Sequence, residues 1–108
     1  QKDNSIKIII ETKEESLSDL IEASKNFPDY TKLMKIANIY FSQKNYQKSI
    51  EWAKKANKLQ PEDYKSWYLF AKSLIQLGKT KDAKKVLKGY IETYGNQEKI
   101  QNLLRSIK

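Results

Sequence analysis

Apolar residues recur three and four positions apart along most of the chain after residue 15, which is the spacing of amphipathic helices. The clearest example is the stretch 67–90, which reads as two helices separated at Gly78. Its apolar positions are Trp67, Phe70, Ala71, Leu74, Ala83, Val86, Leu87 and Tyr90. The same pattern predicts helices at 16–26, 30–42, 46–59, 63–77, 80–94 and 97–107. An all-helical fold with short turns follows.

Polar and helix-breaking residues mark the ends of these predicted helices. Ser16 and Asp29 stand where N-cap residues are expected, and Pro28 stops the helix before it. Gly78 is expected to end one helix, and Thr80 to act as the N-cap of the next. These positions fix the borders of the helices independently of the apolar pattern.

The first fifteen residues lack this helical spacing, and we expect an extended or flexible segment at 1–15. Ile6, Ile8 and Ile10 alternate with other residues, as in a short β-strand. A strand, the end of a helix and a disordered segment all fit this segment. Because the chain begins at Gln1 instead of Met, we expect it to be a fragment or a processed product.

Composition narrows the classes of function that the chain can have. Its 108 residues include 21 basic and 13 acidic side chains, a net charge of +8, which favours acidic partners. Cys and His are both absent, so the commonest general base, metal ligand and thiol nucleophile are missing. No apolar run approaches the roughly 20 residues of a membrane span. We therefore expect no enzyme activity, no catalytic residue, no cofactor and no metal site.

Two basic motifs have simpler interpretations than a ligand site. The run Gly78-Lys79-Thr80 is close to a phosphate-binding loop, but the first Gly of that motif is missing and no strand precedes it. A helix end is the better interpretation. The lysines of the next helix are expected to form a solvated face: Lys81, Lys84, Lys85 and Lys88.

The apolar pattern repeats when the sequence is shifted along itself so that Leu33 aligns with Trp67. The pair at 36–37 then aligns with the pair at 70–71. A period of about 34 residues with two helices per unit resembles the tetratricopeptide repeat (TPR) family. The first repeat matches that family's pattern at Ile36, Ala37, Tyr40, Ala56 and Pro61, with Ser49 in place of Ala. The second matches at Trp67, Ala71, Gly78 and Ala83, and departs from it at Tyr90 and Gly95.

The resemblance implies an all-α, TPR-like α-solenoid with a right-handed superhelix, about five helices and a C-terminal capping helix. Its parts would be a half repeat at 16–29, full repeats at 30–63 and 64–97, and the capping helix at 98–108. Trp67 falls on a core position, whereas Trp52 is expected to be partly exposed. Gly89 is expected to make room for the ring of Tyr90.

In this family the first helix of each repeat lines a concave groove that binds peptides. The residues that the resemblance places there are Met34, Asn38, Phe41, Lys65, Tyr68, Lys72, Ile75 and Lys99. A lysine-rich groove with apolar anchors fits a partner segment that carries acidic and apolar residues. The family's carboxylate clamp for chaperone tails is not expected, because only Asn38 and Lys99 agree with its pattern.

The predicted function is therefore that of a protein–protein interaction module or scaffold in a larger bacterial or envelope-associated assembly. Frequent Lys, Ile, Asn and Tyr suggest a bacterial, AT-rich genome. One alternative is structural self-association into a homo-oligomer, through 6–10 or the open repeat ends. A second is binding of an anionic membrane or nucleic acid by the basic surface. Nucleic acid is the less favoured of these partners, and membrane contact is expected only through residues that precede Gln1. The sequence does not choose between a cytoplasmic and a periplasmic or membrane-anchored location.

Overall fold

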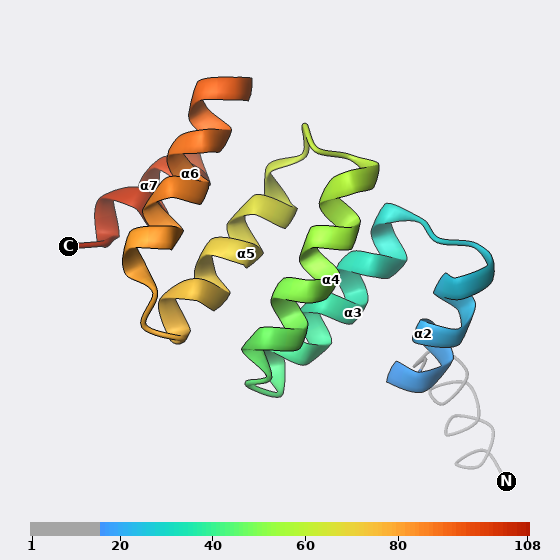
Figure 1. Ribbon diagram of the computed structural model, residues 1–108. Helices are drawn as coiled ribbons and strands as arrows, with labels where there is room; N and C mark the ends of the chain where they lie inside the picture. Colours follow the sequence, from blue (N-terminus) through green and yellow to red (C-terminus); the bar gives the residue numbers. More distant parts are fainter. Residues whose placement is uncertain (1–15) are drawn as a thin grey trace, which may run out of the picture.

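A computed structural model describes residues 16–108, and within that range the chain is entirely helical apart from its turns (Figure 1). Its six helices are α2 (Leu17–Asn26), α3 (Tyr30–Ser42), α4 (Tyr46–Leu59), α5 (Tyr64–Gln76), α6 (Thr80–Tyr94) and α7 (Glu98–Ser106). Each predicted helix is found close to its expected borders. The all-α prediction is confirmed. The predicted extended segment at 1–15 lies outside the described residues.

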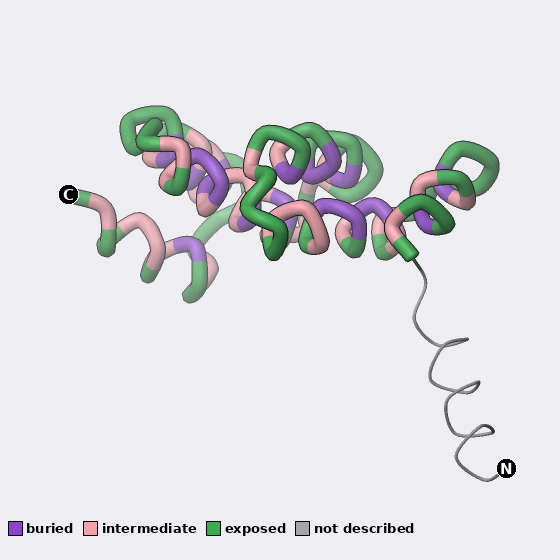
Figure 2. Tube along the Cα trace, turned by 90° about the horizontal axis from the view of Figure 1, so that it is seen from below, coloured by how far each residue is buried: buried purple, intermediate pink, exposed green. Residues whose placement is uncertain are grey.

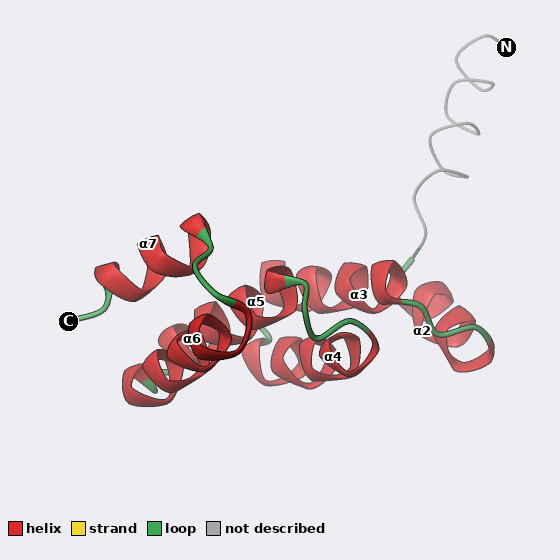
Figure 3. Ribbon diagram, turned by 90° about the horizontal axis from the view of Figure 1, so that it is seen from above, coloured by secondary structure: helices red, strands yellow, loops and turns green. Residues whose placement is uncertain are grey.

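The helices form two layers that stack along one direction (Figure 3). Each helix packs on the next in the chain, and α5 also contacts both α3 and α7. One layer therefore consists of α3, α5 and α7, with α4 and α6 behind it and α2 against α3 at the end. The stack of α2 to α7 is elongated, as expected when each unit contacts only its neighbours (Figure 1).

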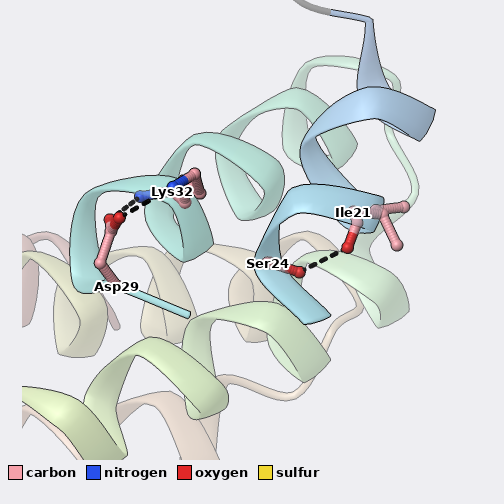
Figure 4. A network of polar contacts seen from close by, with 4 residues as sticks. All are labelled: Ile21, Ser24, Asp29 and Lys32. Carbon is pink, nitrogen blue, oxygen red and sulfur yellow. Dashed lines mark hydrogen bonds and ion pairs between the residues drawn. The ribbon is translucent and has the colours of Figure 1, made fainter. Parts of the chain in front are cut away.

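Side-chain caps begin most of the helices, as the sequence predicts. Ser16 accepts a hydrogen bond from the backbone of Asp19 at 3.1 Å, and Asp29 accepts one from the backbone of Lys32 at 2.7 Å. The Lys32 ammonium also lies 3.2 Å from the Asp29 carboxylate (Figure 4). These interactions, with the backbone hydrogen bond the larger cause, hold the pKa of Asp29 below its usual value. The expected cap at Thr80 is wrong, because Lys79 occupies the N-cap position and makes no side-chain cap.

The two turns within the helix pairs share one conformation. Gly78 has φ +78°, and the hydrogen bonds around it close the end of α5: Lys79 N–H to Leu74 C=O at 2.8 Å and Gly78 N–H to Ile75 C=O at 2.9 Å. The end of α3 has the same pair of bonds, with Lys44 at φ +64°. Both turns thus reverse the chain through a left-handed residue, at equivalent positions of the two repeats.

Two apolar clusters lie between the layers, and the buried residues of each helix face them (Figure 2). The first joins α2, α3, α4 and α5 and includes Leu20, Leu33, Ile36, Trp52, Ala53, Ala56 and Leu69. The second joins α5, α6 and α7 and includes Ala71, Leu74, Ala83, Leu87, Tyr90 and Ile100. The predicted exposure of Trp52 is wrong, since only 9% of it is accessible. Trp52 instead fills the gap that small neighbours on α4 leave.

Small residues let the paired helices approach closely, and the serines among them keep their hydrogen bonds. Ser49 stands where the family has Ala, and its hydroxyl donates to the Ala37 carbonyl at 2.9 Å (the two lie on α4 and α3). The hydroxyls of Ser49 and Ser73 are 3.3 Å apart. At the end of the chain's first described helix, Ser24 likewise donates to the Ile21 carbonyl at 2.7 Å (Figure 4). These buried polar groups therefore carry little desolvation penalty.

Gly89 faces an aromatic ring on the neighbouring helix. A Cβ atom built on Gly89 would lie 3.6 Å from Cζ3 of Trp67 on α5, which is an ordinary van der Waals contact.

Candidate functional site

The layer formed by α3, α5 and α7 is hollowed by two adjoining cavities. The first has a volume of about 820 Å³ and lies between α3 and the loop before α5. The second, of about 250 Å³, lies between α3, α5 and α7. Both are lined by Met34, Asn38 and Lys65, so they form one continuous groove. We refer to this surface as the inner groove.

Six of the eight predicted site residues come together at the second cavity. They are Met34, Asn38, Lys65, Tyr68, Lys72 and Lys99, contributed by α3, α5 and α7. Helical spacing explains their position, because side chains three, four and seven residues apart lie on one face of a helix. The face opposite the core stripe of α3 and α5 is therefore the face that lines the inner groove.

Phe41 joins the site through Lys72 and does not line a cavity itself. The Lys72 ammonium lies 4.8 Å from the centre of the Phe41 ring and 5.3 Å from that of Tyr68. Phe41 in turn meets Tyr46 edge to face at 5.2 Å. Lys72 is thus held between two aromatic rings from α3 and α5, which limits the freedom its side chain has to lose on binding.

Ile75 is set apart from the other predicted residues. Its side chain is half-buried against the second apolar cluster, and it lines neither cavity of the inner groove. It stands one turn beyond Lys72, near the end of α5. Ile75 therefore packs against the core and does not line the inner groove.

The charge of the inner groove changes along its length. Around the second cavity, Lys65, Lys72 and Lys99 are lining residues and no carboxylate is among them. The first cavity adds Lys35 but also Asp63. The Asp63 carboxylate already accepts the backbone N–H of Lys65 at 3.0 Å as the cap of α5. The α7 end of the groove is therefore the more strongly basic one.

A buried phenol stands at the other end of the inner groove. The hydroxyl oxygen of Tyr30 lies inside the fold near Ser66 and Asp63, yet forms no hydrogen bond of good geometry with any described residue. Burial, reinforced by the Asp63 charge, raises the pKa of Tyr30 to about 12. The ring of Tyr30 thereby forms a neutral wall for the first cavity.

Several groove residues were not among those predicted. They are Leu20, Tyr30, Lys35, Ile39, Gln60, Asp63, Tyr64 and Leu69. Leu69 is only 4% exposed and reaches the groove from the first apolar cluster. Tyr64 could have been found from the repeat itself, because it aligns with Tyr30 when one repeat is placed on the other. Tyr64 also contacts Tyr68 edge to face at 6.4 Å.

Within 16–108 there is no group of three or more acidic side chains placed to hold a metal ion. None of the described helices has the length and apolar character needed to cross a membrane. The inner groove combines cavities, positive charge and oriented aromatic rings.

Antiparallel helix pairs that repeat along the sequence and stack in two layers define the chain as a TPR-like helical repeat domain. Residues 10–90 match the family model described as "Anaphase-promoting complex, cyclosome, subunit 3", a TPR-like repeat family, and the chain belongs to this family. A comparison with curated proteins found no significant match. Domains of this type generally bind other proteins and are typically not catalytic.

Proposed function

We propose that the protein is an interaction scaffold that binds a partner segment in the inner groove. The segment would be extended or a short helix and would carry acidic and apolar residues. The observation that supports this most is the second cavity, where three lysines from two helices surround an apolar floor with no carboxylate in its lining. Such a surface attracts negative charge and still offers area for apolar anchors.

The aromatic frame around Lys72 strengthens this proposal. Because Phe41 and Tyr68 hold the ammonium within 4.8 and 5.3 Å of their ring centres, Lys72 is partly desolvated before a partner arrives. An ion pair formed there would be stronger than one formed by a freely moving surface lysine. The partner's acidic residue is therefore expected between α5 and α7, with its apolar anchor in the larger cavity near Met34.

This function fits a component of a larger assembly, and the amino-acid usage favours a bacterial one. The anaphase-promoting complex in the name of the matching family model describes other members, and no partner of theirs is transferred to this chain. The self-association alternative makes a separate prediction, which is a change of mass with concentration. Light scattering at two concentrations, with and without residues 1–15, distinguishes it from the scaffold.

The test compares two charge reversals of equal size. Lys65→Glu with Lys72→Glu changes the inner groove, whereas Lys84→Glu with Lys88→Glu changes α6 outside both groove cavities. The probe is a fluorescein-labelled peptide of alternating glutamate and leucine, followed by anisotropy. We expect the groove pair to weaken binding by about a hundredfold and the α6 pair by less than about threefold. Circular dichroism should show both variants folded.

Two results would contradict this function. Equal losses in both pairs would mean that total charge, and not the groove, attracts the peptide. Unchanged affinity in Lys65→Glu with Lys72→Glu would remove the inner groove from consideration.

A further inference from the structure

We propose that a second surface, on the side of α2 and α4, docks the protein on an anionic membrane. A cavity of about 430 Å³ opens there between the C-terminal halves of the two helices. Ile21, Leu33 and Trp52 contribute apolar lining, and the lysines of its lining are Lys25, Lys55 and Lys58. None of its lining residues belongs to the inner groove. We call this surface the outer notch.

The outer notch is bordered by large apolar side chains that point into solvent. Phe27, directly after α2, is 74% exposed, and Leu59, the last residue of α4, is 47% exposed. The only other large apolar residue exposed within 16–108 is Tyr94, at the end of α6. The C-terminal ends of α2, α4 and α6 lie along one edge of the molecule (Figure 1). All three exposed residues therefore stand on the same edge.

Three lysines line the notch, and one of them is held in place. The Lys55 ammonium lies 4.6 Å from the centre of the Trp52 ring, so it is fixed beside the apolar lining. No carboxylate lines the notch, although the Lys25 ammonium lies 3.7 Å from the Glu22 carboxylate in a solvent-exposed ion pair. Lys55 and Lys58 are both exposed. Lysines next to exposed apolar residues are the combination that binds the interface of anionic lipid bilayers.

A membrane fits this surface better than a partner helix does. The notch is walled by residues 21–26 of α2 and 52–59 of α4, which span about 9 and about 12 Å at the rise of an α-helix. Two turns are too short to hold an amphipathic helix of ordinary length. Phe27, which is 74% exposed and is not a lining residue, would be covered by a bilayer but not by a helix bound in the notch, whereas Leu59 both lines the notch and is exposed. Lipid phosphates would meet the three lysines while the apolar tips enter the interface.

The experiment measures co-sedimentation of the whole chain with two kinds of vesicle at about 0.1 M salt. One kind contains phosphatidylcholine alone, and the other contains added phosphatidylglycerol at about a third of the lipid. We expect binding only to the second kind, and weaker binding at about 0.5 M salt because exposed charges are then screened. A short DNA duplex and the glutamate–leucine peptide serve as other anionic probes.

Three variants locate the surface on the molecule. Phe27→Ser with Leu59→Ser leaves the net charge unchanged and should weaken vesicle binding about tenfold or more. Lys55→Glu with Lys58→Glu should weaken it by about a hundredfold. The matched pair Lys84→Glu with Lys88→Glu should weaken it much less, by about tenfold at most. The altered apolar positions are exposed, so each variant should unfold at the urea concentration of the parent chain.

Each other outcome overturns the proposal. No binding to the anionic vesicles would exclude the membrane outright. Equal losses in the two lysine pairs, with Phe27→Ser and Leu59→Ser harmless and the DNA bound as tightly, would indicate a general polyanion surface. Binding of the peptide that depends on Phe27 and Leu59, without vesicle binding, would assign the notch to a protein partner. The double variant Lys65→Glu with Lys72→Glu tests the proposed scaffold function separately.

Discussion

The two complete helix pairs, 30–63 and 64–97, share one backbone plan but fill it with different side chains. Placing the first on the second aligns Ala53 with Leu87 and Ala56 with Tyr90, and all four are buried. The first pair thus has two small residues where the second has two large ones. The repeat therefore determines the arrangement of the helices and turns, whereas the positions of the large buried side chains differ between the two helix pairs.

The missing volume of the first pair is supplied by its neighbours. Trp52 is 9% exposed on α4, where the equivalent residue of α6 is the half-buried Val86. In the second pair, Tyr90 meets the Trp67 ring at 5.7 Å and donates to the Glu62 carbonyl at 3.2 Å. The large buried residues thus stand at different positions in the two pairs. The comparison predicts that equivalent positions will respond unequally to substitution.

The largest difference is expected at the Ala53 and Leu87 pair of positions. Leu87 is fully buried, so Leu87→Ala should leave a cavity and lower the free energy of unfolding by about 2–5 kcal/mol. The first helix pair already has Ala at this position and is complete without the larger side chain. Urea unfolding followed by circular dichroism measures the loss. The control is Val86→Ala, next to it but half-buried, which should cost clearly less.

The turns give the second comparison, since Lys44 and Gly78 occupy the same left-handed conformation. Glycine adopts this conformation without the clash of a Cβ atom, so Gly78→Ala should destabilise the fold by about 1–2 kcal/mol. Lys44→Gly should stabilise it, because glycine relieves the strain of the left-handed conformation. The gain should be about 1 kcal/mol or less, because glycine also increases the conformational entropy of the unfolded chain. Shifts of the urea midpoint in opposite directions would confirm the equivalence. A stabilising Gly78→Ala would contradict it.

A smaller gain is expected at Gly89, whose equivalent in the first pair is Lys55. Gly89 lies within α6, and alanine is the better helix former by about 1 kcal/mol. The added Cβ would sit 3.6 Å from the Trp67 ring, which is normal contact. Gly89→Ala should therefore raise the thermal midpoint by a few degrees. Gly95→Ala is the matched control and should lower it, because Gly95 has φ +94°. A lower midpoint for Gly89→Ala would mean that Trp67 cannot accommodate the methyl group.

The borders of the helices could be predicted because local signals agree with the apolar pattern. Ser16 and Asp29 cap helices where expected, and Gly78 ends α5 through the left-handed turn. The N-cap at Thr80 was predicted wrongly because Thr favours that position in general, whereas the turn after Gly78 sets the register of α6. Trp52 was misplaced for a related reason. The repeat predicts which faces are buried, but the depth of one side chain depends on the size of its neighbours.

The inner groove was predictable to the extent that it follows from helical faces. Met34, Lys65 and Tyr68 line it because they lie opposite the core stripes. Tyr30 was not predicted, since its burial depends on its position near Asp63 and Ser66, which lie at the start of α5. The outer notch was not predicted either, because it depends on the angle at which α2 packs against α3, which the repeat pattern does not specify. The burial of Tyr30 and the shape of the outer notch both depend on contacts between different elements, which the apolar pattern of a single helix does not show.

The smallest effect at neutral pH is expected at Tyr30, whose equivalent is Tyr64. Tyr30→Phe removes a buried hydroxyl that lacks a good hydrogen bond, so stability at pH 7 should change little.

Above pH 10 the stability of the parent chain and that of Tyr30→Phe should differ. Tyr30 ionises near pH 10 when unfolded and near 12 when folded, so the unfolded chain loses protons first. The stabilising effect of neutral Tyr30 is complete below pH 10 and is lost as the pH rises towards 12. Tyr30→Phe should decline less than the parent chain between about pH 9.5 and 11.5 in urea titrations. Because burial also raises the pKa of Tyr90, a part of the decline should remain in Tyr30→Phe. Equal slopes in the two chains would show that the Tyr30 hydroxyl reaches solvent, so that the first cavity would present a polar group to a ligand.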